Sequence, residues 1–135
     1  MPSSQLKTRG DDRRNISSGG AFEAVFGYSR AVRVNDHVHV SGTCAPAGHE
    51  QSDVATQTRA ALAIIGKALV DAGATWSDVV RTVVYVKDIN EAANVTGAHV
   101  EIFGAIRPAS TLVQVDGFMR PWQQVEIEAY AIVQH

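Results

Sequence analysis

The sequence predicts an α+β fold in which two helices pack on one face of a mixed β-sheet. Segments rich in β-branched residues, or alternating between apolar and polar ones, occur near residues 32–42, 81–87 and 107–133. Apolar residues recur at helical spacing in residues 53–72 and 91–103. These segments give the order β-β-α-β-α-β-β. A chain of 135 residues is long enough for one domain that buries roughly 68% of its unfolded surface.

Residues 1–22 lie outside this pattern. They hold few apolar side chains and many Ser, Gly and charged residues, so burial cannot offset the entropy lost on ordering. A basic arm for nucleic acid is the alternative, but two aspartates interrupt its four cations, which are Lys7, Arg9, Arg13 and Arg14. We therefore expect a disordered tail over residues 1–22 and a single domain over residues 23–135.

Two alternating runs in residues 32–42 meet at Asn35-Asp36, a pair typical of a hairpin turn. We expect four valines on the buried face, Val32, Val34, Val38 and Val40, and Arg33, His37 and His39 on the other. Histidines two residues apart on a strand suit a metal ion, but no third ligand is close in the sequence. The sequence thus predicts no metal site.

Residues 53–72 are predicted to form a helix that starts at the N-cap Asp53 and ends before Gly73. Its apolar stripe comprises Ala55, Thr58, Leu62, Ile65 and Leu69, whereas Gln57, Lys67 and Asp71 are expected to face water. Thr75 then begins a capping box, residues 81–87 form a strand, and a second helix runs from about 91 to 103, before Gly104.

Residues 107–133 read as two strands joined by a loop. In the second strand, apolar residues alternate with polar ones, and Glu126 and Glu128 project on the same side, roughly 7 Å apart. Two like charges at that distance need solvent, a cation or a shared proton. These two carboxylates are the first candidates for chemistry.

Composition restricts the class of protein. The formal net charge of −2 gives no general attraction to nucleic acid or to anionic lipid. No apolar run is long enough to span a bilayer, and the N-terminus lacks the apolar core of a secretory signal. The single cysteine, Cys44, suits a reducing compartment. We expect a cytoplasmic protein with no membrane partner and no cofactor.

Two motifs near the C-terminus carry a family resemblance. Pro108-Ala109 and Val125-Glu126-Ile127-Glu128-Ala129 resemble the C-terminal pattern of the RidA/YjgF family of reactive intermediate deaminases, and Val84–Asn90 resembles its strand–helix junction. The resemblance covers about residues 24–133. It implies a chorismate-mutase-like fold assembled as a homotrimer, with the sheets forming a central barrel and the ligand lying between adjacent subunits.

The resemblance also implies roles for particular residues. Glu126 matches the glutamate that positions a water for attack on an imine carbon, which gives a keto acid and ammonia. Tyr28 and Ser41 match residues that line the cleft. Ser110, by contrast, occupies the position at which the deaminases carry an arginine that binds the substrate carboxylate. A hydroxyl has neither the charge nor the paired donors of a guanidinium.

Several residue assignments stay open at this point. Arg107 or Arg120 is a candidate to replace the missing arginine, and Trp122 is either an aromatic wall of the cleft or a cover for the sheet end. Cys44 is either a nucleophile or, more in keeping with the sequence, a small packed thiol. His99 is either an acid–base group or a packing residue.

The expected function is that of a small-metabolite binding or processing protein, with a carboxylate or imine-like ligand. A hydrolase acting on imine or enamine C=N bonds is one form of it. The alternatives are a non-catalytic metabolite-binding trimer and, favoured least, an RNA-acting or protein-interaction scaffold, because no basic patch is interleaved with aromatic residues.

Overall fold

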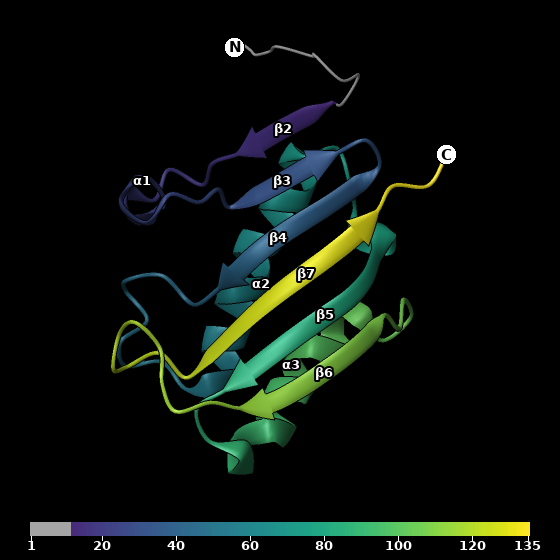
Figure 1. The fold of residues 1–135 in the computed structure, drawn as a ribbon. Helices are drawn as coiled ribbons and strands as arrows, with labels where there is room; N and C mark the ends of the chain where they lie inside the picture. The colour runs from purple at the N-terminus through teal and green to yellow at the C-terminus, as the bar shows by residue number, and fades with distance from the viewer. Residues whose placement is uncertain (1–11) are drawn as a thin grey trace.

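The computed structural model describes residues 12–135 as one mixed sheet with the two long helices on one face (Figure 1). The strands are β2 (Arg13–Ile16), β3 (Ala31–Val34), β4 (His37–Thr43), β5 (Val79–Val86), β6 (Ala109–Gln114) and β7 (Val125–Ile132). The helices are α1 (Ala21–Phe26), α2 (Val54–Asp71) and α3 (Ala92–Phe103), with short 3-10 turns η1 (Trp76–Asp78) and η2 (Ile89–Glu91). The predicted α+β fold is confirmed.

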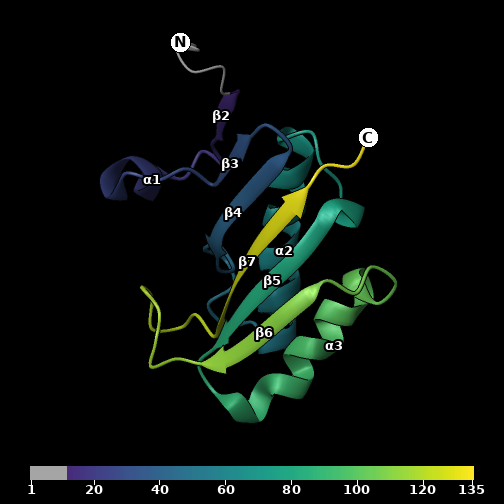
Figure 2. The same cartoon turned by 45° about the vertical axis from the view of Figure 1, so that its right-hand side comes forward.

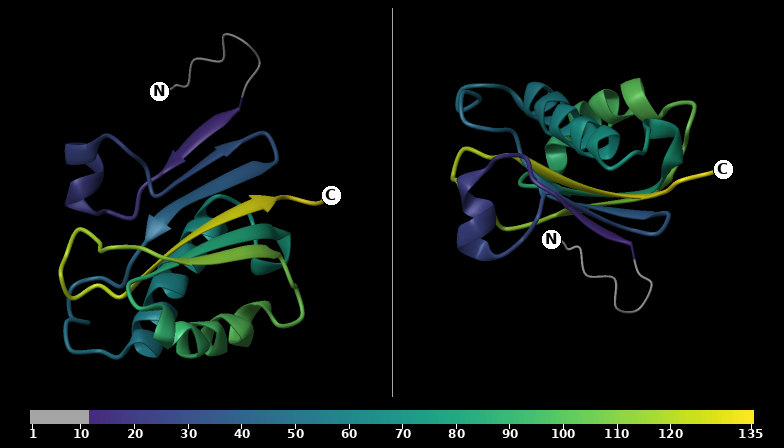
Figure 3. Two further views of the ribbon diagram at one scale, coloured as in Figure 1. Left: turned by 60° about the horizontal axis from the view of Figure 1, so that its bottom comes forward. Right: turned by 90° about the horizontal axis from the view of Figure 1, so that it is seen from above.

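The sheet has the strand order β2-β3-β4-β7-β5-β6, so the two C-terminal strands are not neighbours. β5 lies between β6 and β7, pairing parallel with β6 and antiparallel with β7. A parallel pair needs a long crossover connection, and α3 supplies it. Helices α2 and α3 lie side by side on one face of the sheet, and the opposite face carries neither (Figures 2 and 3).

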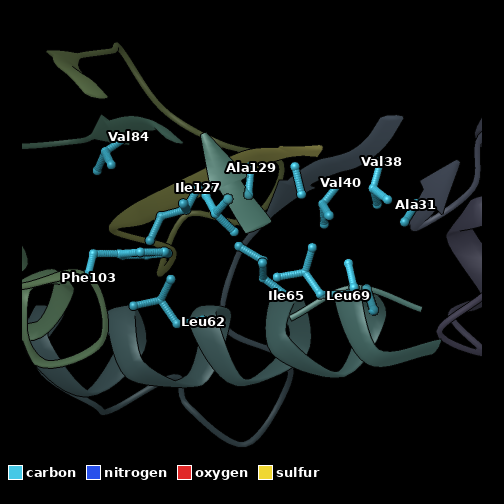
Figure 4. Packing of buried hydrophobic residues seen from close by; sticks show 14 of the residues in the cluster. Ala31, Val38, Val40, Leu62, Ile65, Leu69, Val84, Phe103, Ile127 and Ala129 are labelled. Atoms are coloured by element: carbon cyan, nitrogen blue, oxygen red, sulfur yellow. The ribbon is translucent and has the colours of Figure 1, made fainter. Parts of the chain in front are cut away.

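The core lies between α2 and the middle of the sheet. Leu62, Ile65 and Leu69 of α2 are fully buried and point toward valines of β4 and toward Ile127 and Ala129 of β7 (Figure 4). Burial of each large aliphatic side chain contributes about 1.5–3 kcal/mol. Four of the five residues of the predicted stripe, Thr58, Leu62, Ile65 and Leu69, are buried, whereas Ala55 is only partly buried. The stripe fixes which face of β7 is turned inward.

The ends of α2 are also as predicted. The Asp53 side chain accepts a hydrogen bond from the Thr56 amide at 2.8 Å, and Gly73 after the helix has a φ of 82°. That left-handed conformation is one that glycine adopts without strain. The capping box at Thr75 is present, and α3 ends at Phe103 before Gly104.

The prediction that Gln57 faces water is wrong. Its side chain is 0% exposed. The Nε2 group lies 3.2–3.4 Å from the carbonyl oxygens of His49, Ser52 and Trp122, and Oε1 accepts from the Gln124 amide at 3.0 Å. The Gln57 side chain therefore links two loops to α2 by hydrogen bonds. Helical periodicity does not reveal this role.

The side-chain directions expected for β3 are also wrong. In the two-residue turn, Asn35 has a φ of 52°, and Val34 pairs with His37 and Val32 with His39. Directly paired residues point to the same face. Val32 and Val34 therefore share the helix-free face with the histidines, while Arg33 reaches the α2 end and donates to the Ala72 carbonyl oxygen at 2.9 Å.

The expected tail is ordered in part. Residues 13–16 form β2, which pairs antiparallel with β3, and α1 begins at Ala21. The Arg14 guanidinium donates to the Ala72 carbonyl oxygen at 2.7 Å. Pairing with the sheet edge supplies the order that apolar burial does not, so the boundary predicted at residue 22 is wrong for residues 12–22. Residues 1–11, with Lys7 and Arg9, lie outside the described residues.

Replacing Gln57 by leucine tests the buried amide. The Gln57→Leu variant leaves one buried N–H and several carbonyl oxygens without their partner, so we expect the free energy of unfolding to fall by about 2–4 kcal/mol. Urea denaturation followed by circular dichroism measures it. Gln51→Leu, the same change at an exposed position, is the control, and an equal effect there would contradict the structural role of Gln57.

Candidate functional site

A cleft of about 1430 Å³ opens between the N-terminal segment and the rest of the domain. One wall is formed by residues 16–20 and α1, and a second by the end of β4 and the turn that follows it, residues 41–47. The loop before β7, the start of β7 and one side of α2 also line the cleft, with Met119, Arg120, Trp122 and Glu126 from the first two and Ala63, Ile64, Lys67, Ala68 and Asp71 from α2. The cleft therefore brings together segments from both halves of the chain.

A bulge in β4 shapes the floor of this cleft. Val40 pairs with Ala129 and Thr43 pairs with Ile127, so β4 has one more residue than β7 over this interval. Such an insertion bends a strand and redirects its side chains. The bulged residues are Ser41 and Gly42, and both line the cleft.

Glu126 lies beside this bulge, on the face of β7 that α2 does not cover. A Cβ built on Gly42 would lie 2.2 Å from Glu126 Oε2, so glycine is required for the carboxylate to lie where it does. Within residues 12–135, the one hydrogen-bond partner of the Glu126 side chain is Cys44, whose Sγ lies 3.5 Å from Oε1. A thiol is a weak donor. The carboxylate therefore keeps most of its accepting capacity for a ligand or water.

Glu128, on the same face of β7, is satisfied by the protein. The hydroxyl groups of Tyr85 and Tyr130 both donate to its carboxylate. The hydrogen bond to Glu128, with help from burial, raises the pKa of Tyr85 to about 12. The two carboxylates that look equivalent in the sequence are thus different, and only Glu126 is open toward the cleft.

Arg30 is a cleft residue that the sequence analysis missed. Its guanidinium donates to the Gly42 carbonyl oxygen at 2.9 Å, to Thr43 Oγ1 at 2.8 Å and to the Tyr28 hydroxyl at 2.8 Å. Tyr28, which the resemblance assigns to the ligand cleft, is among the residues that line this cavity. Since Arg30 follows Tyr28 by two residues, the alternation of an extended chain was the signal that could have found it.

The other predicted cleft residues differ in where they lie. Ser41 lines the cleft, and its hydroxyl donates to the Ser29 carbonyl oxygen at 2.7 Å. Trp122 lines it as well, with its backbone carbonyl held by Gln57. Of the two candidate arginines, Arg120 lies along the cleft, whereas Arg107 is exposed at the turn before β6, with a φ of 56°.

Ser110 is not among the residues that line this cleft. It pairs with Thr82 across β5 and β6, and its hydroxyl lies 2.8 Å from Thr82 Oγ1, which lies 3.0 Å from His99 Nε2. These three side chains lie on the helix side of the sheet, because Thr82 is fully buried beneath α3. In a single chain, Ser110 and His99 are therefore separate from Glu126.

The surroundings of Cys44 favour a packed thiol over a nucleophile. Burial raises its pKa, and the negative charge of Glu126 raises it further. A nucleophilic cysteine needs the opposite shift. Within residues 12–135 no group of three or more His, Cys, Asp or Glu side chains is placed to hold a metal ion.

Comparison with known proteins identifies the family. The model of the Endoribonuclease L-PSP family matches residues 19–133. The chain belongs to this family, also called RidA/YjgF. A crystal structure of Rv2704 from Mycobacterium tuberculosis, described as a member of the YjgF/YER057c/UK114 family, is 47% identical with a TM-score of 0.86 and covers 90% of this chain and 100% of its own.

Two curated relatives of this RidA/YjgF chain cover nearly the whole domain. An uncharacterised protein of Streptomyces coelicolor is 36% identical over 87% of this chain and 91% of its own length. A 2-iminobutanoate/2-iminopropanoate deaminase of Bos taurus is 33% identical over 89% of this chain and 90% of its own. Among the described residues, no helix is long and apolar enough to cross a membrane.

The reactivity of Cys44 tests the electrostatics of the site. Replacing Glu126 by glutamine removes the charge that raises the thiol pKa, so a larger fraction of Cys44 is ionised at pH 8 and iodoacetamide labels it faster. Because the chain has one cysteine, the labelling measured by mass spectrometry reports on Cys44 alone. Glu128→Gln is the control, and faster labelling of both variants would contradict the assignment.

The half-buried His99 predicts a pH dependence of stability. Burial lowers its pKa below the ordinary 6.5, so the unfolded chain binds protons that the folded chain rejects. The free energy of unfolding is then at its full value above pH 6.5 and falls as the pH drops toward the folded pKa. We expect His99→Gln to flatten this fall in urea titrations between pH 7.5 and 5.5. If His37→Gln, at an exposed position, flattens it equally, the assignment to His99 is wrong.

Proposed function

We propose that this protein binds and processes small metabolites, and that its cleft hydrolyses the C=N bond of imines, including imines that form by tautomerisation of enamines. The observation that carries the proposal is the carboxylate of Glu126, which lines the cleft and accepts from one weak donor, Cys44, among residues 12–135. A carboxylate with free lone pairs is suited to orient a water molecule and accept its proton.

In the proposed reaction, water held by Glu126 adds to the carbon of a 2-imino acid. The new C–O bond forms as the C=N π electrons move to nitrogen, and Glu126 takes a proton from the water. Return of protons to the nitrogen allows the C–N bond of the carbinolamine to break. Ammonia leaves, and the carbon becomes the carbonyl of a 2-oxo acid. The balance is one imine and one water consumed for one oxo acid and one ammonia.

Two features support this chemistry over other roles for the cleft. The deaminase of Bos taurus, with the activity that its name states, aligns with nearly the whole domain. Glu126 and Gly42 lie on the paired strands β7 and β4, and Tyr28 and Cys44 lie on the segments that adjoin β3 and β4. A site built on strands keeps the precision that water activation requires.

A homotrimer is part of the proposal. The helix-free face of the sheet carries partly exposed apolar side chains, among them Val32, Val34 and Val113. Association of copies through this face would cover them. The single cysteine suits a reducing compartment, and we propose the cytoplasm as the location.

A non-catalytic metabolite-binding trimer is the second candidate. Ser110 favours it, because the hydroxyl cannot replace the arginine expected at that position and is already bonded to Thr82. An RNA-acting role has less support. The family name includes endoribonuclease, but the net charge of −2 provides no general attraction to a phosphate backbone.

The decisive measurement is the release of ammonia from 2-imino acids generated freshly by an amino-acid oxidase. The wild-type protein is expected to accelerate release over buffer, and Glu126→Gln to lose that acceleration by about 10²-fold or more. Glu128→Gln, the same change two residues away, is expected to stay close to the wild-type rate.

The outcomes separate the candidates. Release no faster than in buffer, for both aliphatic and aromatic imino acids, would refute the hydrolase proposal and favour the binding protein. Equal losses in both glutamate variants would show that the sheet face as a whole, rather than the open carboxylate, is needed.

A further inference from the structure

Arg30 is a buried cation that forms no ion pair among the described residues. It is 9% exposed, and within residues 12–135 no carboxylate lies within ion-pair distance of it, although the charge of Arg30 helps to lower the pKa of the nearby Glu23. Its Nε is buried and has no hydrogen-bond acceptor. A buried guanidinium that is hydrogen-bonded only to neutral oxygens is costly, and an anion bound beside it would offset that cost.

Gly42 connects this cation to the candidate catalytic carboxylate. The Gly42 carbonyl oxygen accepts from the Arg30 guanidinium at 2.9 Å, and the Gly42 Cα faces Glu126 Oε2. Cys44 lies within the field of both charges, since Arg30 lowers its pKa and Glu126 raises it. These two charges fit a ligand that carries an anionic group next to an electrophilic carbon. The anionic group would lie at Arg30 and the carbon near Glu126.

An apolar surface adjoins the same cation. The Phe26 ring stacks on Phe22, and both pack edge-on against Tyr28, whose hydroxyl and ring contact Arg30. Phe26 is 72% exposed and Met119, across the cleft, is 75% exposed. Large exposed apolar side chains that gather in a cleft mark a place where an apolar group binds.

We propose that Arg30 binds the carboxylate of the ligand in place of the arginine expected at Ser110, and that the ligand carries a bulky apolar substituent that contacts Phe22, Phe26 and Met119. The inference rests on the proposed function for the identity of the cleft, but it concerns binding and requires no turnover. The ligand class is then a 2-imino or 2-oxo acid with a branched or aromatic side chain.

The test uses 4-methyl-2-oxopentanoate, a stable oxo acid, as the probe in titrations of the full chain. Its neutral carboxamide and the smaller pyruvate are the comparison ligands. We expect the carboxamide to bind at least about tenfold more weakly, the loss of one charge-assisted bond pair, and pyruvate about tenfold more weakly, the loss of two or more buried methylenes. Equal affinity for the carboxamide overturns the anion site, and equal affinity for pyruvate overturns the apolar one.

Substitutions test which arginine binds the carboxylate of the ligand. Arg30→Gln is expected to reduce carboxylate affinity at least tenfold, and Arg30→Lys to retain part of it. Arg59→Gln, at an exposed ion pair on α2, is expected to bind as the wild type does. A loss in Arg120→Gln with none in Arg30→Gln would assign the role to the exposed arginine and overturn the proposal.

A direct readout covers the case in which Arg30→Gln fails to fold. In ¹⁵N-labelled wild-type protein, the Nε–H resonance of Arg30 is expected to shift on addition of the oxo acid, while that of Arg59 does not. No shift at saturation overturns the proposal. Because these readouts need no catalysis, they test carboxylate binding at Arg30 separately from imine hydrolysis.

Discussion

The register of β7 is the constraint on which the site depends. Val125, Ile127, Ala129 and Ala131 are buried against α2 and its neighbours, which forces the alternate residues to the other face. A shift by one residue would turn the carboxylates of Glu126 and Glu128 into the apolar core. The same burial that stabilises the sheet therefore holds Glu126 at the edge of the cleft.

A second constraint acts at Gly42. The bulge in β4 brings Gly42 so close to Glu126 that a side chain at this position would displace the carboxylate, and the Gly42 carbonyl oxygen accepts from Arg30. One small residue thus separates a carboxylate from a guanidinium. The two charges do not neutralise each other directly, so both retain capacity for a ligand that lies between them.

The two glutamates show how context decides chemistry. Both follow from the alternation of one strand, yet Glu128 accepts from two tyrosine hydroxyls while Glu126 meets a single thiol. Tyr85 reaches Glu128 from β5, a strand some forty residues earlier. The strand that lies beside β7 therefore decides that Glu128 is held by the protein and that Glu126 stays open.

The sequence by itself determined the two long helices, the five strands from β3 to β7, most of the stripe of α2 and the side of β7 on which Glu126 lies, because each is governed by local periodicity and capping. It did not determine the burial of Gln57, the orientation of Val32, the formation of strand β2 or the position of Arg30. Those depend on partners far along the chain: loop carbonyls, a turn register, a sheet edge and a bulge. Only the tertiary structure brings such groups within hydrogen-bond distance, and it alone decided which charged residues share a cleft.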